Sequence, residues 1–416
     1  MRKRVGKAGL KTAVGFACLC AIASTAQASA PFSEAEAKQQ LRAAEAILEG
    51  AMPKAELTIA LRDLALALPK LDGSAERRAE RILSRPPDGT GRFGGSWPDN
   101  AKEQTVETPA FVIHYAKVPD CKVDDENCDE PDKTDNAPSN GIPDYVDATV
   151  DAVNESIQVE NDELGWPDPK GDGNEGEPQG SSETDRFDIY LSDLCGSGSC
   201  VFGYAQPDDN SNECSANFRC SAHLVLDNDY AEFGQSGGLL GLRVTTAHEY
   251  NHVLQFNLDT NQDDWMFEST ATWSEEQVFP NDDDWVRSYM DSWARETEIP
   301  ITKSEFHIYG SAVWNHWLEN GDNSYGPDVI LNAWESSRDV TPKDYAVGAY
   351  NDAILDEGGA GFSQEFSAFT AATAEWNAGD GNFPDAAELP EVQRLGKLNL
   401  GDKSRKQVLD NTAYAL

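Results

Sequence analysis

Positive charge is scarce in this chain. Its 416 residues include 33 Lys and Arg against 73 Asp and Glu, so the formal net charge is −40 at pH 7. Nucleic acids and anionic membranes repel a protein of this charge, and we expect neither as a partner. The same charge suits an exported protein and favours neutral or basic substrates.

Long apolar runs are also missing. The apolar stretch 12–23 is too short for a permanent membrane anchor, and no later segment is apolar enough to cross a bilayer. It lies between the basic start Met1–Lys7 and small residues that lead to Ala28, an order that is typical of a secretory signal peptide. We therefore expect residues 1–28 to be removed and the protein to be secreted, or periplasmic if the source has an outer membrane. The sequence leaves the oligomeric state open.

Cysteine is sparse, with eight residues, two of them inside the expected signal peptide. The other six fall into three close pairs, and in an exported chain such pairs predict local disulfides. A Cys-rich metal cluster is the alternative, but these spacings fit no strong zinc pattern. The expected pairs are Cys121 with Cys128, Cys195 with Cys200, and Cys214 with Cys220.

Histidine is rarer still, with six residues, yet two of them stand four apart in the stretch His248-Glu-Tyr-Asn-His252. Residues four apart share one face of a helix, with Cβ atoms about 5–6 Å apart. Two imidazoles can therefore bind one ion while Glu249 lies beside it. The pattern predicts a zinc site, and a catalytic zinc site needs a third protein ligand and a place for water.

A second helix is expected at 265–276, with Glu268 in its first turns. Its Glu-x-x-Ala pattern resembles the glutamate-bearing helix of the gluzincins, the thermolysin-like zinc proteases, and this resemblance makes Glu268 the expected third ligand. The interval is shorter than in thermolysin, so Glu275 and Glu276 stay open as alternatives. Glu275 shares a helix face with Glu268 and can orient a metal-bound His, whereas Glu276 is expected on a solvated surface. No His follows at the metzincin spacing.

The chemistry that follows from this site is hydrolysis. Glu249 is the expected general base, which takes a proton from a water whose pKa zinc lowers from about 15.7 toward roughly 7. The carbonyl oxygen of the substrate needs a hydrogen-bond donor as negative charge develops on it. Gluzincins place a Tyr or His after the third ligand for this task. Tyr309 is the first candidate, His316 the second and His307 the third.

The rest of the chain is expected to alternate between strands and helices. Residues 29–105 are predicted to form a helical segment and a linker, as either a pro-region or a small packed subdomain. We expect Leu224–Leu226 to be the sheet edge that pairs with an extended peptide. The acidic loop 120–140 is either a calcium site or a solvated loop. The predicted strands are 110–115, 186–191, 201–205 and 222–227.

Several of these segments together resemble a family of secreted bacterial metalloproteases that was first catalogued in myxobacteria. They include Gly141-Ile-Pro-Asp-Tyr-Val146, Asp185-Arg-Phe-Asp-Ile-Tyr-Leu191, the His248–Phe256 stretch, Trp265–Trp273 and Tyr309–Trp314, and the likeness spans roughly residues 55–415. That family is assigned to peptidase clan MA by its motif. The resemblance implies an α+β, zincin-like fold of two lobes.

In this fold the first lobe, 106–260, holds a small mixed sheet and the helix with the two His residues. The second lobe, 261–400, is mainly helical and carries the third ligand, and 401–416 is a terminal strand that can begin a β-rich region. The expected function is that of a zinc endopeptidase that hydrolyses proteins or peptides. The alternatives are a calcium-binding surface or adhesion protein with a structural zinc ion, and a zinc amidase that acts on cell-wall peptides.

Overall fold

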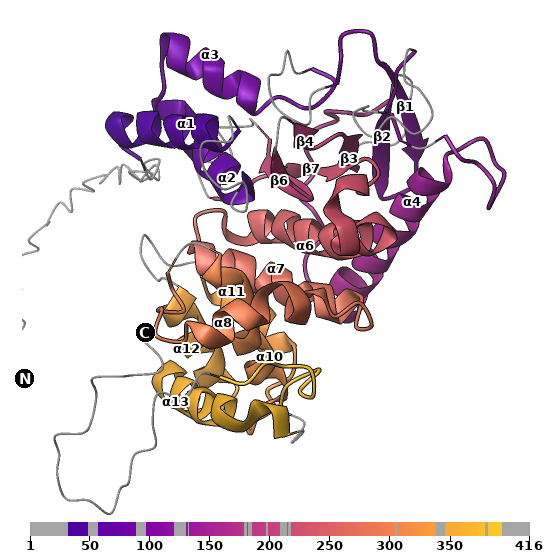
Figure 1. Cartoon of the computed structure of the whole chain (residues 1–416). Helices are drawn as coiled ribbons and strands as arrows, with labels where there is room; N and C mark the ends of the chain where they lie inside the picture. Colours follow the sequence, from indigo (N-terminus) through magenta and orange to yellow (C-terminus); the bar gives the residue numbers. More distant parts are fainter. Residues whose placement is uncertain are drawn as a thin grey trace, which may run out of the picture.

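A computed structural model gives the arrangement of the chain (Figure 1). It describes residues 32–48, 57–88, 97–119, 130–131, 133–178, 181, 185–196, 199–208, 214, 218–303, 306–337, 346–378 and 382–392. Helices and a small mixed sheet make up this part of the chain, which confirms the α+β class. No helix within these ranges has the length and apolar character that crossing a membrane requires.

The sheet has five strands in the order β1-β2-β3-β7-β6. The three central strands run parallel, and each outer strand is antiparallel to its neighbour. Every residue of β3 and β7 is buried, as expected for strands that are covered on both faces. The strands are β1 Lys102–Glu107, β2 Phe111–Lys117, β3 Phe187–Ser192, β6 Gly203–Pro207 and β7 Ala222–Asp227, and a separate pair is formed by β4 Cys195–Gly196 and β5 Ser199–Cys200.

The prediction that Leu224–Leu226 forms an edge of the sheet is wrong. Leu224–Leu226 belongs to β7, which lies between β3 and β6 and is hydrogen-bonded on both sides. The two edge strands are β1 and β6, and β6 follows β5 in sequence and is antiparallel to β7. The sequence predicted a strand at 201–205, but the order of the strands depends on pairing between distant segments, which the tertiary structure decided.

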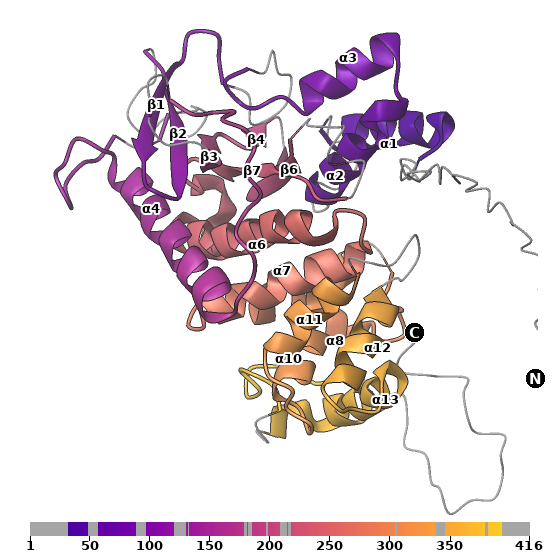
Figure 2. The ribbon, with the colours of Figure 1, turned by 180° about the vertical axis from the view of Figure 1, so that it is seen from behind.

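Helices cover both faces of the sheet (Figures 1 and 2). On one face, α4 and α6 pack against the side chains of Ile189 and Leu224. On the other face, α1, α2 and α3 pack against Tyr190 and Val225, the alternate residues of the same strands. The helices are α1 Glu34–Leu48, α2 Leu57–Ala67, α3 Gly73–Ile82, α4 Asp144–Ser156 and α6 Gly238–Asp259, with short turns η2 Leu68–Lys70, η3 Ile157–Glu163 and η4 Ala231–Ser236.

The C-terminal half is helical, as predicted, and it lies on the side of α6 that faces away from the sheet (Figures 1 and 2). Its interior is rich in buried tryptophan, including Trp273, Trp314 and Trp334. Its elements are α7 Asp264–Val278, η5 Val286–Met290, α8 Asp291–Arg295, α9 His307–Gly310, α10 Ala312–Asn320, α11 Asp328–Ser337, α12 Ala346–Asp356, α13 Phe362–Ala372 and η6 Thr373–Ala378. The strand predicted at 401–416 lies outside the described residues.

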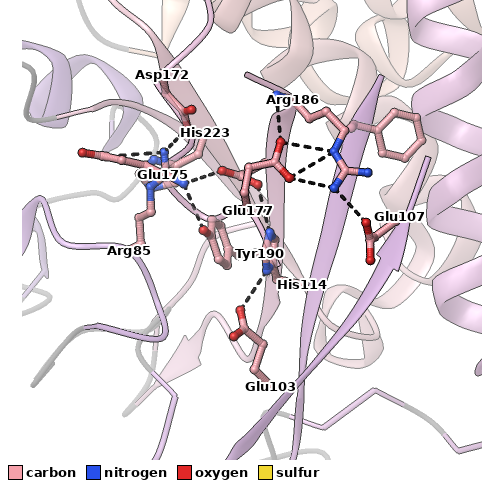
Figure 3. A network of polar contacts seen from close by, with 12 residues as sticks. Arg85, Glu103, Glu107, His114, Asp172, Glu175, Glu177, Arg186, Tyr190 and His223 are labelled. Atoms are coloured by element: carbon pink, nitrogen blue, oxygen red, sulfur yellow. Dashed lines mark hydrogen bonds and ion pairs between the residues drawn. The ribbon is translucent and has the colours of Figure 1, made fainter. Parts of the chain in front are cut away.

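A buried polar network fastens the N-terminal helices to the sheet (Figure 3). Arg85, just after α3, forms ion pairs with Asp172 at 2.6 Å, with Asp208 at 2.9 Å and with Asp188. The ring of His223 contacts Asp208 through Nδ1 at 2.8 Å. His223 is itself buried.

Two of the three expected disulfides are present. Cys195 pairs with Cys200, and Cys214 pairs with Cys220. Cys121 and Cys128 lie outside the described residues. These local bridges are compatible with an exported protein.

Candidate metal centre

The two His residues of α6 and the first Glu of α7 meet in the interior where the helices pack together. The Nε2 atom of His248 lies 3.2 Å from Nε2 of His252 and 3.2 Å from Oε2 of Glu268. The distance from His252 Nε2 to Glu268 Oε2 is 3.5 Å. The predicted triad is therefore assembled in the structure, with all three residues buried.

These distances match the demands of a zinc ion. Ligand atoms placed about 2.0–2.2 Å from a tetrahedral zinc lie roughly 3.3–3.6 Å from one another. Two imidazole nitrogens and one carboxylate oxygen are also a donor set that zinc prefers in catalytic sites. On geometry and on chemistry, His248, His252 and Glu268 fit the ion.

The other ring nitrogen of each His is held by a second residue. Nδ1 of His248 lies 2.7 Å from Oε1 of Glu275, and Nδ1 of His252 lies 2.8 Å from Oε1 of Gln255. Contacts of this kind orient a ligating His and leave its Nε2 free for the metal. Glu275 thus occupies the orienting position rather than the ligand position.

Gln255 was not among the site residues predicted from the sequence. Its side-chain nitrogen donates to Oδ1 of Asn251 at 2.6 Å and to the carbonyl of Phe267 at 3.1 Å. Because both donors of the amide are used, its oxygen is directed at His252. The available signal was a Gln three residues after the second His, on the same side of the helix.

Glu249 lies beside the triad and takes no part in it. Its Oε2 accepts a hydrogen bond from the hydroxyl of Thr58 at 3.0 Å. Thr58 belongs to α2, so a residue from the N-terminal helices reaches the expected general base. No sequence pattern indicated this contact across 191 positions.

A cavity of about 510 Å³ opens next to His248 and Glu249. The ring of Tyr309 stacks on the ring of His248 at 5.9 Å, and Tyr289 stacks on Tyr309 at 5.1 Å. Tyr309 and Tyr289 both line this cavity, and Tyr289 was not singled out by the sequence. Other lining residues are Val201, Phe202, Gly203, Val244, Thr245, Glu275, Asp284, Ser288 and Phe306.

The two His alternatives to Tyr309 lie elsewhere. His316 is buried against the ring of Trp285 at 4.5 Å, and burial lowers its pKa to about 3. His307 stacks on Trp293 at 5.6 Å. Neither ring lines the cavity beside the triad.

The site concentrates negative charge around the two imidazoles. Burial alone would lower the pKa of His248, but hydrogen bonds to Glu268 and Glu275 raise this pKa well above its ordinary value. Burial opposes ionisation of Glu268, yet the charge of His252 and the contact with His248 hold its pKa at about 2. Carboxylates that stabilise a proton on His248 can equally stabilise a metal cation.

Glu276 was expected on a solvated surface, and that prediction is wrong. Only 8% of its surface is exposed. It points away from the triad toward Asp283 and Asp385. The sequence pattern of α7 cannot report what later segments of the chain cover.

The acidic loop is described only in part, since 120–129 lie outside the described residues. In its second half, Asp135 accepts the backbone N–H groups of Asn140 and Gly141, and Asp144 accepts those of Asn136 and Ala137. These carboxylates organise the turn before α4. A calcium ion in this loop stays a prediction.

In comparisons with known proteins, no family model matches the chain, and no curated protein matches it. The functional conclusion therefore rests on the chemistry of the site itself.

Proposed function

We propose that this protein is a secreted zinc metalloendopeptidase of gluzincin type. The observation that carries the proposal is the convergence of His248, His252 and Glu268, with Glu249 beside them and outside the ligand set. A structural zinc site has no use for such a spare carboxylate, whereas hydrolysis requires one. The likeness to secreted bacterial metalloproteases and the two-lobed zincin architecture belong to the same proposal.

In this mechanism each residue has one task. His248, His252 and Glu268 would hold zinc, which supplies a water of lowered pKa and polarises the scissile carbonyl. Glu249 accepts the proton of the attacking water on its carboxylate and delivers it to the leaving nitrogen. Tyr309, on the wall of the cavity, donates a hydrogen bond to the carbonyl oxygen as charge develops there.

The substrate would lie along the edge strand β6. Gly203 lines the cavity, and the N–H of Ala205 already bonds to Thr58 at 3.1 Å. An extended peptide would therefore pair with the Gly203 end of β6 and place one side chain in the cavity. Among the described residues that line the cavity, none is dedicated to capturing a free terminus, and we propose that the enzyme cleaves internal peptide bonds.

Metal removal tests this function directly. We expect one zinc per purified mature chain, complete loss of hydrolysis of unfolded protein when zinc is chelated, and recovery when zinc is returned. Zinc without hydrolysis of any peptide would instead support a structural ion in a surface protein. Hydrolysis that is confined to cell-wall peptides would identify an amidase.

A further inference from the structure

A second group of carboxylates converges outside the zinc centre. Glu276 lies in the last turn of α7, Asp283 in the loop that follows, and Asp385 in the segment 382–392 after η6. One oxygen of each lies within 4.8 Å of the others. The fold alone brings them together, because more than a hundred residues separate Asp385 from the other two.

Two of the oxygens in this group are buried without a partner. Oε2 of Glu276 and Oδ2 of Asp385 accept no hydrogen bond from any described residue, and Glu276 is 8% exposed. Asp283 faces a cation, since Nη1 of Arg287 lies 3.8 Å from its Oδ2. A buried carboxylate oxygen without a partner is costly, and the three neighbouring acidic side chains repel one another when they are ionised.

The position of Glu276 adds to this cost. The C-terminal end of a helix carries partial negative charge, which disfavours an acid in the last turn of α7. Burial, followed by the charges of Asp385 and Asp283, raises the pKa of Glu276 to about 9. A cation bound among the three side chains would remove all of these penalties together.

The chemistry of the donors indicates which cation. All three offer carboxylate oxygens, which suit a hard ion such as calcium, whereas zinc sites in proteins use nitrogen or sulfur as well. Calcium–oxygen distances are about 2.3–2.6 Å, so three oxygens within 4.8 Å of one another can all reach one calcium ion. We propose that Glu276, Asp283 and Asp385 bind a calcium ion that joins the end of α7 to the segment 382–392.

A calcium ion at this site would also stabilise the zinc centre. Glu275, the neighbour of Glu276 on α7, holds Nδ1 of His248 at 2.7 Å. A calcium ion on Glu276 would fix the turn of α7 that carries both residues. The site is separate from the acidic loop 120–140, which lies before α4.

Calcium-dependent thermal unfolding tests the proposal. With one equivalent of zinc present, we expect calcium to raise the Tm of the wild-type protein by about 5 °C at a hundred times its dissociation constant. Glu276→Gln and Asp385→Asn should each lose most of this shift and keep their zinc. Without calcium, both variants should melt at or above the wild-type Tm, because repulsion among the acids is relieved.

Asp291→Asn is the matched control, since it removes one acid from a side chain that is 63% exposed. This variant should keep the full calcium shift. A wild-type protein that does not respond to millimolar calcium would overturn the proposal. So would a full shift in both Glu276→Gln and Asp385→Asn, which would place the calcium elsewhere, for instance in the acidic loop.

A different observation concerns the general base. The hydroxyl of Thr58 donates to Oε2 of Glu249 at 3.0 Å and accepts the N–H of Ala205 at 3.1 Å. The hydroxyl has one proton, so the bond from Ala205 directs that proton at Glu249. All three residues are buried. The edge strand, α2 and the base thus form one hydrogen-bonded chain.

The helix that carries Thr58 is firmly placed. Arg62, one turn further along α2, donates to the carbonyl of Gln262 at 3.1 Å and pairs with Asp264 at 2.7 Å. Its guanidinium also lies 4.8 Å from the ring centre of Phe267, next to the ligand Glu268. α2 is therefore tied both to β6 and to the start of α7.

We infer that Thr58 is a positioning residue for Glu249, and hence that α2 is part of the catalytic site. This inference rests on the proposed peptidase function. By occupying one oxygen of Glu249, the hydroxyl fixes the rotamer of the base and leaves the other oxygen for the attacking water. The N-terminal helices then stay with the enzyme instead of leaving as a pro-region.

The test compares Thr58→Val with Thr58→Ser. We expect Val to lower kcat on the order of tenfold with KM changed less than twofold, and Ser, which keeps the hydroxyl, to restore most of kcat. Ser74→Ala, an exposed change in α3, is the control and should behave as wild type.

An active wild type with unchanged kcat in Thr58→Val would refute the positioning role. A rise in kcat in the same variant would also refute it, and would show that α2 obstructs the site. If the wild-type protein has no peptidase activity, the proposed function itself is wrong. The two failures are thereby distinguished.

Discussion

Glu249→Gln is expected to abolish peptide hydrolysis while the protein keeps its zinc. Glutamine has the shape of the acid but cannot take a proton from the attacking water, and general-base catalysis is worth about 10²–10⁴-fold in rate. Glu249 lies outside the proposed ligand set, and its carboxylate accepts a hydrogen bond from Thr58. The measurement is kcat on an unfolded protein substrate, together with the zinc content of the same preparation.

Glu80→Gln, an exposed substitution in α3, is the matched control for this experiment. It should leave both kcat and zinc content unchanged. Hydrolysis that survives in Glu249→Gln at the wild-type rate would sink the proposed mechanism. Loss of zinc from this variant would show that Glu249 is a ligand and that the assignment of the triad is wrong.

Glu268→Gln is expected to have the largest effect on metal binding. It replaces a charged ligand by a neutral amide, and we expect zinc affinity to fall by more than about 10²-fold, beyond the roughly 10–100-fold that the loss of an orienting contact costs. Glu275→Gln removes such a contact from His248 and should fall within that smaller range. Competition with a zinc-binding dye measures both variants.

Glu80→Gln, the exposed substitution in α3, serves as the control for this pair as well. Its zinc affinity should equal that of the wild type. The reverse order, with Glu275→Gln losing more zinc than Glu268→Gln, would mean that Glu275 is the third ligand. Equal losses of zinc affinity in Glu268→Gln and Glu275→Gln would contradict the assignment of Glu268 as ligand and Glu275 as the residue that orients His248.

Spacing along one helix was enough to predict the core of the site. His248 and His252 share a helix face whatever the rest of the chain does, and the Glu of the next helix followed from the resemblance to gluzincins. Spacing alone could not separate Glu268 from Glu275, because both lie on the same face of α7. The packing of α7 against α6 distinguishes them, because it places Glu268 at Nε2 and Glu275 at Nδ1 of His248.

Contacts between distant segments had no signal in the sequence. Thr58 reaches Glu249 only because α2 packs against β6, and Glu276 meets Asp385 only because the segment 382–392 returns to the end of α7. The edge of the sheet was misplaced for the same reason, since strand order depends on pairing and not on strand propensity.

The sequence by itself thus determined the local features: the strands at 110–115, 186–191, 201–205 and 222–227, the two described disulfides and the two His residues on one helix face. These depend on periodicity and spacing over a few residues. The tertiary structure alone decided which side chains from distant segments meet. It placed Glu268 with the His pair, brought Thr58 to Glu249 and gathered the second carboxylate group, because such contacts arise from the packing of whole elements.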